Sequence, residues 1–378
     1  MRKRTILPII LFGLLLAAPI AGLSQAASGA ASTGNGSRAI VLDVVVTGKS
    51  GAPAEGLQAG DFKLFDNKQP QSLVSVQSAG GNAAASSPVE AILLLDAVNL
   101  DFTTVANERK LLSDYLRKNG GQLALPTSLI LLTDSGPQMP SQPTQDGNAL
   151  AAYLNDSATG LPTFQRNSGA YSAEERWQIS LRSLNNIVAY ESRKPGRKLL
   201  IWLSTGWPAF SQATVRNTTQ NQEKLFASVA AFSTGLRQAR ITLYSIDPMG
   251  AGQTQIVVQK APESLTERRG GSHMPAAQAG QGALYYQEFL KGVEKPRDAD
   301  YGDLLLGVLA TQSGGQVFFG NNDLAGLVSK CIDDARAYYV LTFNSPAAAH
   351  PGEYHGIEVQ VEKPGLKTRT RAGYYAQP

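Results

Sequence analysis

The sequence predicts an α/β protein in which a doubly wound, mostly parallel sheet is inserted into a small β-sandwich. Two observations predict this architecture. From residue 89 to residue 337, short apolar segments alternate with amphipathic ones, and strands joined by helices over such short connections pair in parallel through right-handed crossovers. Residues 39–77 and 338–378 have β character alone, and because two or three strands are only marginally stable, we expect these two sets to pair with each other.

The first 26 residues predict a secretory signal peptide. Three basic residues at positions 2–4 precede a long apolar run, and the small residues Ser24 and Ala26 frame a cleavage site. An uncleaved membrane anchor is the alternative, and two prolines within the run make it the weaker interpretation. We therefore expect an exported protein, periplasmic or extracellular, with a flexible linker at residues 27–38 and no membrane span after cleavage.

The charge balance and the cysteine content limit the partners and the covalent cross-links that we expect. The chain of 378 residues has 34 basic and 30 acidic side chains, and removing the three basic residues of the leader leaves 31 against 30. A mature chain this close to neutrality predicts no nucleic-acid partner. The single cysteine, Cys331, can form no internal disulfide, and it shares a helical face with Leu324, Leu327 and Val328, so we expect it to be buried.

The predicted elements follow in chain order. The N-terminal part of the sandwich has strands at residues 40–47, 62–65 and 73–76, followed by a linker at 78–88, and the C-terminal part has strands at 338–343, 355–362 and 367–374. Five strands of the α/β region are expected in "AILLLDAV", "SLILLTDSG", "KLLIWLSTG", "ITLYSIDP" and "QVFFG". Helices are expected in "NERKLLSDYLRK", "GNALAAYLND", "SAEERWQISLRSLNNIVAYES", "EKLFASVAAFSTGLRQAR", "DLLLGVLATQSGG" and "DLAGLVSKCIDDARA". Residues 249–300 interrupt this alternation and predict a long excursion with one short helix near "GALYYQEFLKGV".

Eight segments carry a resemblance to a known family. They are "GLQAGDFKLFDNKQPQ", "AILLLDAVN", "LLTDSGP", "KLLIWLSTGWP", "ITLYSIDPMG", "ATQSGGQVFF", "AYYVLTF" and "TRTRAGYYA", spread over residues 40–376. Their order resembles the Rossmann-like von Willebrand factor type A (VWA) fold, and in detail the VWFA-related Acidobacterial domain family of secreted proteins, to which no function is assigned. The resemblance implies that residues 89–337 form a VWA-like domain and that its function is binding.

The resemblance also implies where a metal would bind. VWA domains that bind ligand through a metal use a D-x-S-x-S motif after the first strand, a threonine on a second loop, and an aspartate after the fourth strand. Asp96 matches the first position, but Val98 and Leu100 stand where the two serines belong, and Ser204 stands where the second aspartate belongs. We therefore expect a degenerate metal site and no cofactor, with weak Mg²⁺ or Ca²⁺ binding through Asp96 as the open alternative.

Polar residues still gather at the carboxyl ends of the predicted strands, the edge at which open α/β sheets bind ligands. They are Asp96, Asn99, Asp101, Ser204 and Thr205. A rebuilt oxygen-rich site is one interpretation; the one we favour is that Asp96 accepts backbone N–H bonds and that Asn99 and Asp101 are turn formers. Trp207 is a sixth candidate, either as an exposed anchor for a partner or as a ring that covers the end of the sheet.

Other catalytic patterns are missing from the sequence. It has no G-x-S-x-G, its three histidines lie in loops or at a strand edge, and "HPGEYH" does not match a zinc-binding spacing. We therefore expect a non-enzymatic interaction module that binds a protein or cell-surface partner. The alternative is a hydrolase or metal-dependent enzyme that uses residues 249–300, and it predicts that Asp298, Asp300 or Glu288 approaches Asp96.

Overall fold

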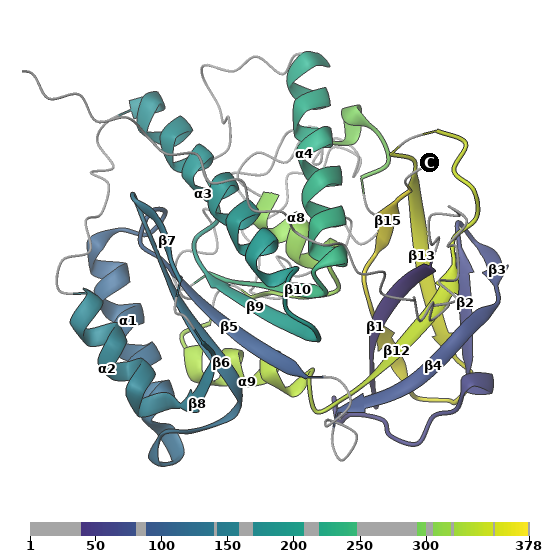
Figure 1. Cartoon of the computed structure of the whole chain (residues 1–378), viewed down its shortest axis with the longest axis horizontal. Helices are drawn as coiled ribbons and strands as arrows, with labels where there is room; N and C mark the ends of the chain where they lie inside the picture. The colour runs from purple at the N-terminus through teal and green to yellow at the C-terminus, as the bar shows by residue number, and fades with distance from the viewer. Residues whose placement is uncertain are drawn as a thin grey trace, which may run out of the picture. The chain divides into compact units, whose positions relative to one another are not determined.

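The computed structural model describes residues 39–80, 88–139, 142–158, 169–207, 219–247, 293–299, 305–318, 321–350 and 352–376. The predicted signal peptide and linker, and residues 249–292 and 300 of the predicted excursion, lie outside these ranges. The described chain is a mixed α/β structure with one mostly parallel seven-stranded sheet and two antiparallel four-stranded sheets (Figure 1). The coarse fold class expected from the sequence is therefore confirmed.

The seven-stranded sheet has the order β11-β10-β9-β5-β6-β7, with β8 also paired to β6. Its parallel strands are β5 (Val89–Asp96), β6 (Gln122–Thr133), β9 (Arg197–Leu203), β10 (Ile241–Ile246) and β11 (Val317–Phe318). Two short strands, β7 (Gly136–Gln138) and β8 (Thr144–Asp146), run antiparallel to β6. The predicted start of β6, Ser128, was too late: pairing with β5 begins at Thr127, and residues 122–126 precede it, with Gln122 paired to Asp146 of β8.

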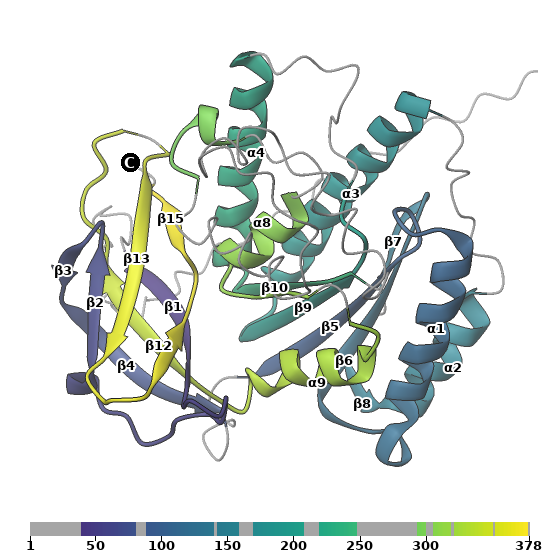
Figure 2. The ribbon, with the colours of Figure 1, turned by 180° about the vertical axis from the view of Figure 1, so that it is seen from behind.

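Helices cover both faces of this sheet, as Figure 2 shows. Helices α1 (Phe102–Arg117), α2 (Gly147–Ala158) and α9 (Leu324–Asp333) share one hydrophobic cluster with the sheet. Helices α3 (Gly169–Glu191), α4 (Thr219–Gln238) and α8 (Leu305–Gln312) share a second. Strand β5 supplies Leu93 and Leu95 to the first cluster and Ile92 and Leu94 to the second, so its continuous apolar run is explained by burial on both faces.

The two antiparallel sheets each combine strands from the two ends of the described chain. One has the order β14-β1-β12-β4 and the other β15-β13-β2-β3. Their bounds are β1 (Ala39–Thr47), β2 (Phe62–Asp66), β3 (Gln69–Gln71), β4 (Leu73–Gly80), β12 (Ala337–Asn344), β13 (Tyr354–Val361), β14 (Lys367–Arg369) and β15 (Gly373–Tyr375). A third hydrophobic cluster draws side chains from both sheets, among them Leu42 of β1 and Leu64 of β2.

Two details of these sheets differ from the prediction. The expected strand 367–374 is two strands, β14 and β15, which belong to different sheets. Strand β3 was not predicted; it forms a hairpin with β2 because Asn67 and Lys68 both adopt positive φ angles, 47° and 67°, in a tight two-residue turn.

Three short 3-10 helices complete the described elements: η1 (Ala59–Asp61), η3 (Lys118–Gly121) and η7 (Pro296–Asp298). Cys331 is fully buried on the apolar face of α9 beside Leu327 and Val328, which confirms the expectation from helical spacing. Among the described helices, none combines the length and the apolar character that a membrane crossing requires.

Candidate binding site at the carboxyl edge of the parallel sheet

The candidate site lies where the strand order reverses. Strand β5 pairs with β6 on one side and with β9 on the other, and ligands of open α/β sheets bind outside the carboxyl ends of the strands at such a point. Leu95 pairs with Leu203, so the next residues, Asp96 and Ser204, leave the two neighbouring strands side by side. The structure therefore places these two candidates together.

Asp96 is completely buried, and each of its carboxylate oxygens accepts two hydrogen bonds. The backbone N–H groups of Val98 and Asn99 donate to Oδ1 at 3.1 and 2.9 Å. Asn99 Nδ2 and Trp202 Nε1 donate to Oδ2 at 2.8 and 2.9 Å. Burial raises the pKa of Asp96, and the hydrogen bonds from Asn99, Trp202 and Ser204 act in the opposite direction. This is the geometry of an acid that organises its own loop, because four donors already surround its oxygens.

The neighbouring candidates are held in the same network. Asn99 Nδ2 also donates to Ser180 Oγ of α3 at 2.9 Å, and Thr205 Oγ1 donates to the Asn99 carbonyl oxygen at 3.3 Å. Ser204 Oγ bonds the backbone of Gly206, accepting from its N–H at 3.2 Å. These bonds join the loops after β5 and β9 to helix α3.

Asp101 has a separate role as the N-cap of α1. Its side chain accepts hydrogen bonds from the backbone N–H of Thr104 at 2.8 Å and from Thr104 Oγ1 at 3.0 Å. A side-chain acceptor at this position satisfies a backbone donor that the first helical turn leaves unpaired. This geometry agrees with the interpretation of Asp101 as a structural residue.

Trp207 is fully buried, so its ring presents no surface to a partner. It packs edge-on against Trp202, at a centroid distance of 5.1 Å, and against Trp177 of α3, at 6.3 Å. The chain has three tryptophans, and all of them therefore belong to one cluster beside Asp96. Of the two interpretations of Trp207, its burial favours the ring that covers the end of the sheet and contradicts the exposed anchor.

The enzyme alternative relied on acids of residues 249–300. Asp300 and Glu288 lie outside the described residues, so their approach to Asp96 stays a prediction. Asp298 ends η7, which packs against α4. Within the described ranges, no group of three or more His, Cys, Asp or Glu side chains is placed to hold a metal ion.

An exposed aromatic residue at this edge was not among the predicted site residues. Phe102 begins α1 directly after Asp101, and it is 70% exposed. In the described part of the chain, the other strongly exposed large hydrophobic residues are Val41 and Val74, which belong to the antiparallel sheets. The predicted helix began at Asn107, whereas α1 begins five residues earlier, so the prediction did not place Phe102 in the first helical turn.

Trp202 and Glu108 were also missed. Glu108 is buried on α1, and its position was readable, since it stands three and four residues before Leu111 and Leu112 on the predicted apolar face. The role of Trp202 was not readable, because a strand buried on both faces gives no indication of which side chain will reach a neighbouring loop.

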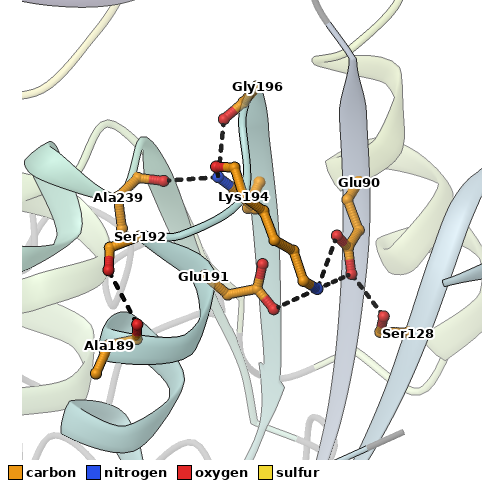
Figure 3. Close-up of polar contacts among 9 residues, drawn as sticks. Glu90, Ser128, Ala189, Glu191, Ser192, Lys194, Gly196 and Ala239 are labelled. Atoms are coloured by element: carbon orange, nitrogen blue, oxygen red, sulfur yellow. Dashed lines mark hydrogen bonds and ion pairs between the residues drawn. The ribbon is translucent and has the colours of Figure 1, made fainter. Parts of the chain in front are cut away.

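A second polar cluster lies at the opposite, amino-terminal edge of the sheet (Figure 3). Lys194 Nζ contacts Glu191 at 2.9 Å and Glu90 of β5 at 3.3 Å, and Ser128 of β6 donates to Glu90. Burial raises the pKa of Glu191. For Lys194, burial acts to lower the pKa, but the hydrogen bond to Glu191 and the negative charges of both glutamates outweigh it, so the pKa is raised. Because these opposite charges neutralise each other, we interpret the cluster as a structural network.

A third cluster joins strands of one antiparallel sheet. His355 Nδ1 lies 2.7 Å from Asp66 Oδ1, and the Tyr374 hydroxyl donates to Asp66 Oδ2 at 2.5 Å. Burial raises the pKa of Tyr374, and its hydrogen bond to Asp66 raises it further. His355 Nε2 lies 3.9 Å from Glu353 Oε1, and this group of side chains links β2, β13 and β15.

Comparisons with known proteins add no assignment: no family model matches the chain, and a search of the curated proteins finds no match.

Proposed function

We propose that this chain is an exported, non-enzymatic interaction module of VWA-like fold, which binds a protein or cell-surface partner at the carboxyl edge of its parallel sheet without a metal. The observation that carries the proposal is the exposed Phe102, which stands beside an edge whose acid, Asp96, is closed by its own hydrogen bonds. An exposed aromatic side chain next to polar groups is the kind of residue that dominates binding energy at protein interfaces.

The arrangement of strands supports the VWA-like part of this proposal. With β8, which pairs only with β6, left aside, the six other strands of this sheet, numbered in chain order with β7 as the third, run 3-2-1-4-5-6. This is a Rossmann-type order with an antiparallel edge strand, as the family resemblance implies. The hydrophobic cluster shared by the two antiparallel sheets supports a β-sandwich base at residues 39–77 and 338–378.

The metal-free part of the proposal rests on the geometry around Asp96. A divalent cation needs carboxylate lone pairs, and those of Asp96 already receive four donors, two of them from the rigid backbone after β5. Val98 and Leu100, which replace the two serines of the metal-binding motif, are both 2% exposed and lie in hydrophobic clusters on opposite faces of the sheet.

The experiment that tests the proposal compares two exposed hydrophobic positions. Purified mature protein, Phe102→Ala and the control Val74→Ala are immobilised and exposed to an extract of cell-envelope proteins, with Mg²⁺ and with EDTA. Val74 is 61% exposed on β4, so its replacement removes a similar apolar group from a different surface. We expect a bound protein that Phe102→Ala loses and Val74→Ala keeps, in both buffers. Equal binding by the three proteins, or binding that EDTA abolishes, would contradict the proposal.

Calorimetric titration with Mg²⁺, Mn²⁺ and Ca²⁺ tests the metal-free part separately. We expect no saturable heat from the mature protein or from Asp96→Ala. Saturable binding that is lost in Asp96→Ala would show that Asp96 is a metal ligand after all.

A further inference from the structure

A small cavity lies at the same carboxyl edge, between α1 and α9. Its volume is about 60 Å³, and it is lined by Asn107, Glu108, Leu111, Ile246, Asn321, Asn322 and Leu324. Ile246 ends β10, and Asn321 and Asn322 directly precede Asp323, the N-cap of α9. One water-sized probe requires about 10–15 Å³ of such space, so the cavity has room for several atoms of a ligand.

Glu108 is the charged group in the wall of this cavity. It is 2% exposed, and its Oε1 accepts a hydrogen bond from Asn107 Nδ2 at 3.2 Å. Its Oε2 is also buried and has no hydrogen-bond partner among the described residues. A buried carboxylate oxygen without a partner is unfavourable, because it has lost its hydrogen bonds to water, and a bound cation or a proton removes this cost.

The electrostatic surroundings of Glu108 also favour the binding of a positive charge. Burial, and to a smaller extent the negative charge of Asp247, which follows β10, together raise the pKa of Glu108 to about 7 against the opposing bond from Asn107. Near neutral pH the group is thus held between its protonated and ionised forms, and a cation that reaches it can replace the proton.

The remaining walls indicate which cation fits. Leu111, Ile246 and Leu324 provide apolar surface, while Asn107, Asn321 and Asn322 are exposed and place amide groups at the surface. A hard divalent metal requires six or more oxygen ligands, and the described residues offer it a single carboxylate in this wall. An ammonium group on an alkyl chain matches better, because its methylene groups pack on the apolar walls while its nitrogen donates to Glu108 Oε2.

We propose that the Glu108 cavity binds a primary ammonium group carried on an alkyl chain, as in a lysine side chain, and that the partner presents such a residue there. The second half of this inference rests on the function proposed above. Phe102 and Glu108 lie six residues apart on α1, about 9 Å along the helix axis and about 120° apart around it, so a partner that contacts both has to extend around the helix.

The test uses n-butylammonium as the probe and the full mature chain as the protein. Binding is followed by NMR of glutamate-labelled protein for wild type, Glu108→Gln and the control Asp114→Asn, an exposed acid on the same helix that pairs with Lys110. We expect saturable binding by wild type and by Asp114→Asn, and at least a tenfold weaker affinity in Glu108→Gln. We also expect wild-type affinity to fall at least tenfold from pH 8 to pH 5, because the protonated carboxyl no longer attracts the cation.

Several results would overturn the inference. They are the absence of saturable binding, equal binding by Glu108→Gln, equal binding of the neutral probe n-butanol, and a response to Ca²⁺ that n-butylammonium does not displace. The pH dependence of wild type alone decides the matter if Glu108→Gln does not fold. Phe102→Ala should bind the probe like wild type, so failure of the ammonium site and failure of the Phe102-dependent interaction are separate observations.

Discussion

Replacement of Asp96 by asparagine separates a structural acid from a metal ligand. Asp96→Asn preserves the size of the side chain but replaces one acceptor oxygen with a donor NH₂ group. The asparagine Oδ1 can still accept from the backbone N–H groups of Val98 and Asn99, whereas its Nδ2 then faces two donors, Trp202 Nε1 and Asn99 Nδ2. In a metal site the same change would remove a ligand and leave the metal-free protein almost as stable as before.

The expected loss of stability in Asp96→Asn follows from the two donors that lose their acceptor oxygen. A buried donor left without a partner costs about 1–3 kcal/mol. The Trp202 indole loses its hydrogen bond to Asp96, while Asn99 Nδ2 keeps its bond to Ser180, so the cost at Asn99 is the smaller of the two. We expect Asp96→Asn to reduce the free energy of unfolding by about 2–4 kcal/mol in EDTA.

The assay is urea-induced unfolding followed by tryptophan fluorescence, since Trp177, Trp202 and Trp207 all lie in the cluster beside Asp96. A double-mutant cycle with Trp202→Phe isolates the bond itself, and we expect a coupling energy of about 1–2 kcal/mol. Stability within about 0.5 kcal/mol of wild type in EDTA would refute the reasoning, as would stabilisation of wild type, but not of the variant, by Mg²⁺.

Two further predictions concern other buried charges. Burial raises the pKa of Glu108 from 4.5 to about 7, so the fold favours its protonated form. The stability that this provides is fully present below about pH 4.5 and is lost as the pH rises through about 7. Between pH 4.5 and pH 8, the free energy of unfolding of wild type, measured by urea titration, should therefore fall by up to about 3 kcal/mol relative to that of Glu108→Gln. A difference between the two proteins that does not change with pH would contradict this prediction. Lys194→Met should destabilise the protein by about 2–4 kcal/mol, because it leaves Glu90 and Glu191 buried without their cation, whereas Lys110→Met, which breaks an exposed pair with Asp114, should cost less than about 1 kcal/mol. Thermal melts of the two lysine variants compare these costs directly, and equal shifts of the melting temperature would count against the structural role of the network.

Much of the fold was predictable because its signals are local. The continuous apolar run of β5 and the helical periodicity of α1 and α9 each reflect a face that must be buried, and the structure buries it. The short strands β3, β7 and β8 were missed, since three residues carry too little periodicity to be recognised.

The site was less predictable, because the hydrogen bonds of Asp96 and the burial of Trp207 depend on contacts between segments that are distant in the sequence. The sequence placed Asp96 beside Ser204, but the donors on Asp96 include Trp202, which lies 106 residues away in sequence. Trp207 was an equally open question, since its burial depends on Trp177 from a helix between the two loops. By contrast, the unusual position of Glu108 on an apolar helical face could have been read from the sequence alone.

Restoring the missing serine ligands would not by itself create a metal site at this edge. Serines at positions 98 and 100 would place hydroxyl groups among side chains of the two hydrophobic clusters, on opposite faces of the sheet. Even then, a cation would have to displace the indole N–H of Trp202, whose ring is fixed against Trp207. The buried network therefore makes the loop after β5 a rigid support, and under the function we propose, recognition is left to the surface that this loop positions. That surface begins with α1, which Asp101 caps and which carries both Phe102 and Glu108. We therefore expect changes at the exposed Phe102 to alter binding and leave the fold intact, whereas changes at Asp96 will alter the fold first.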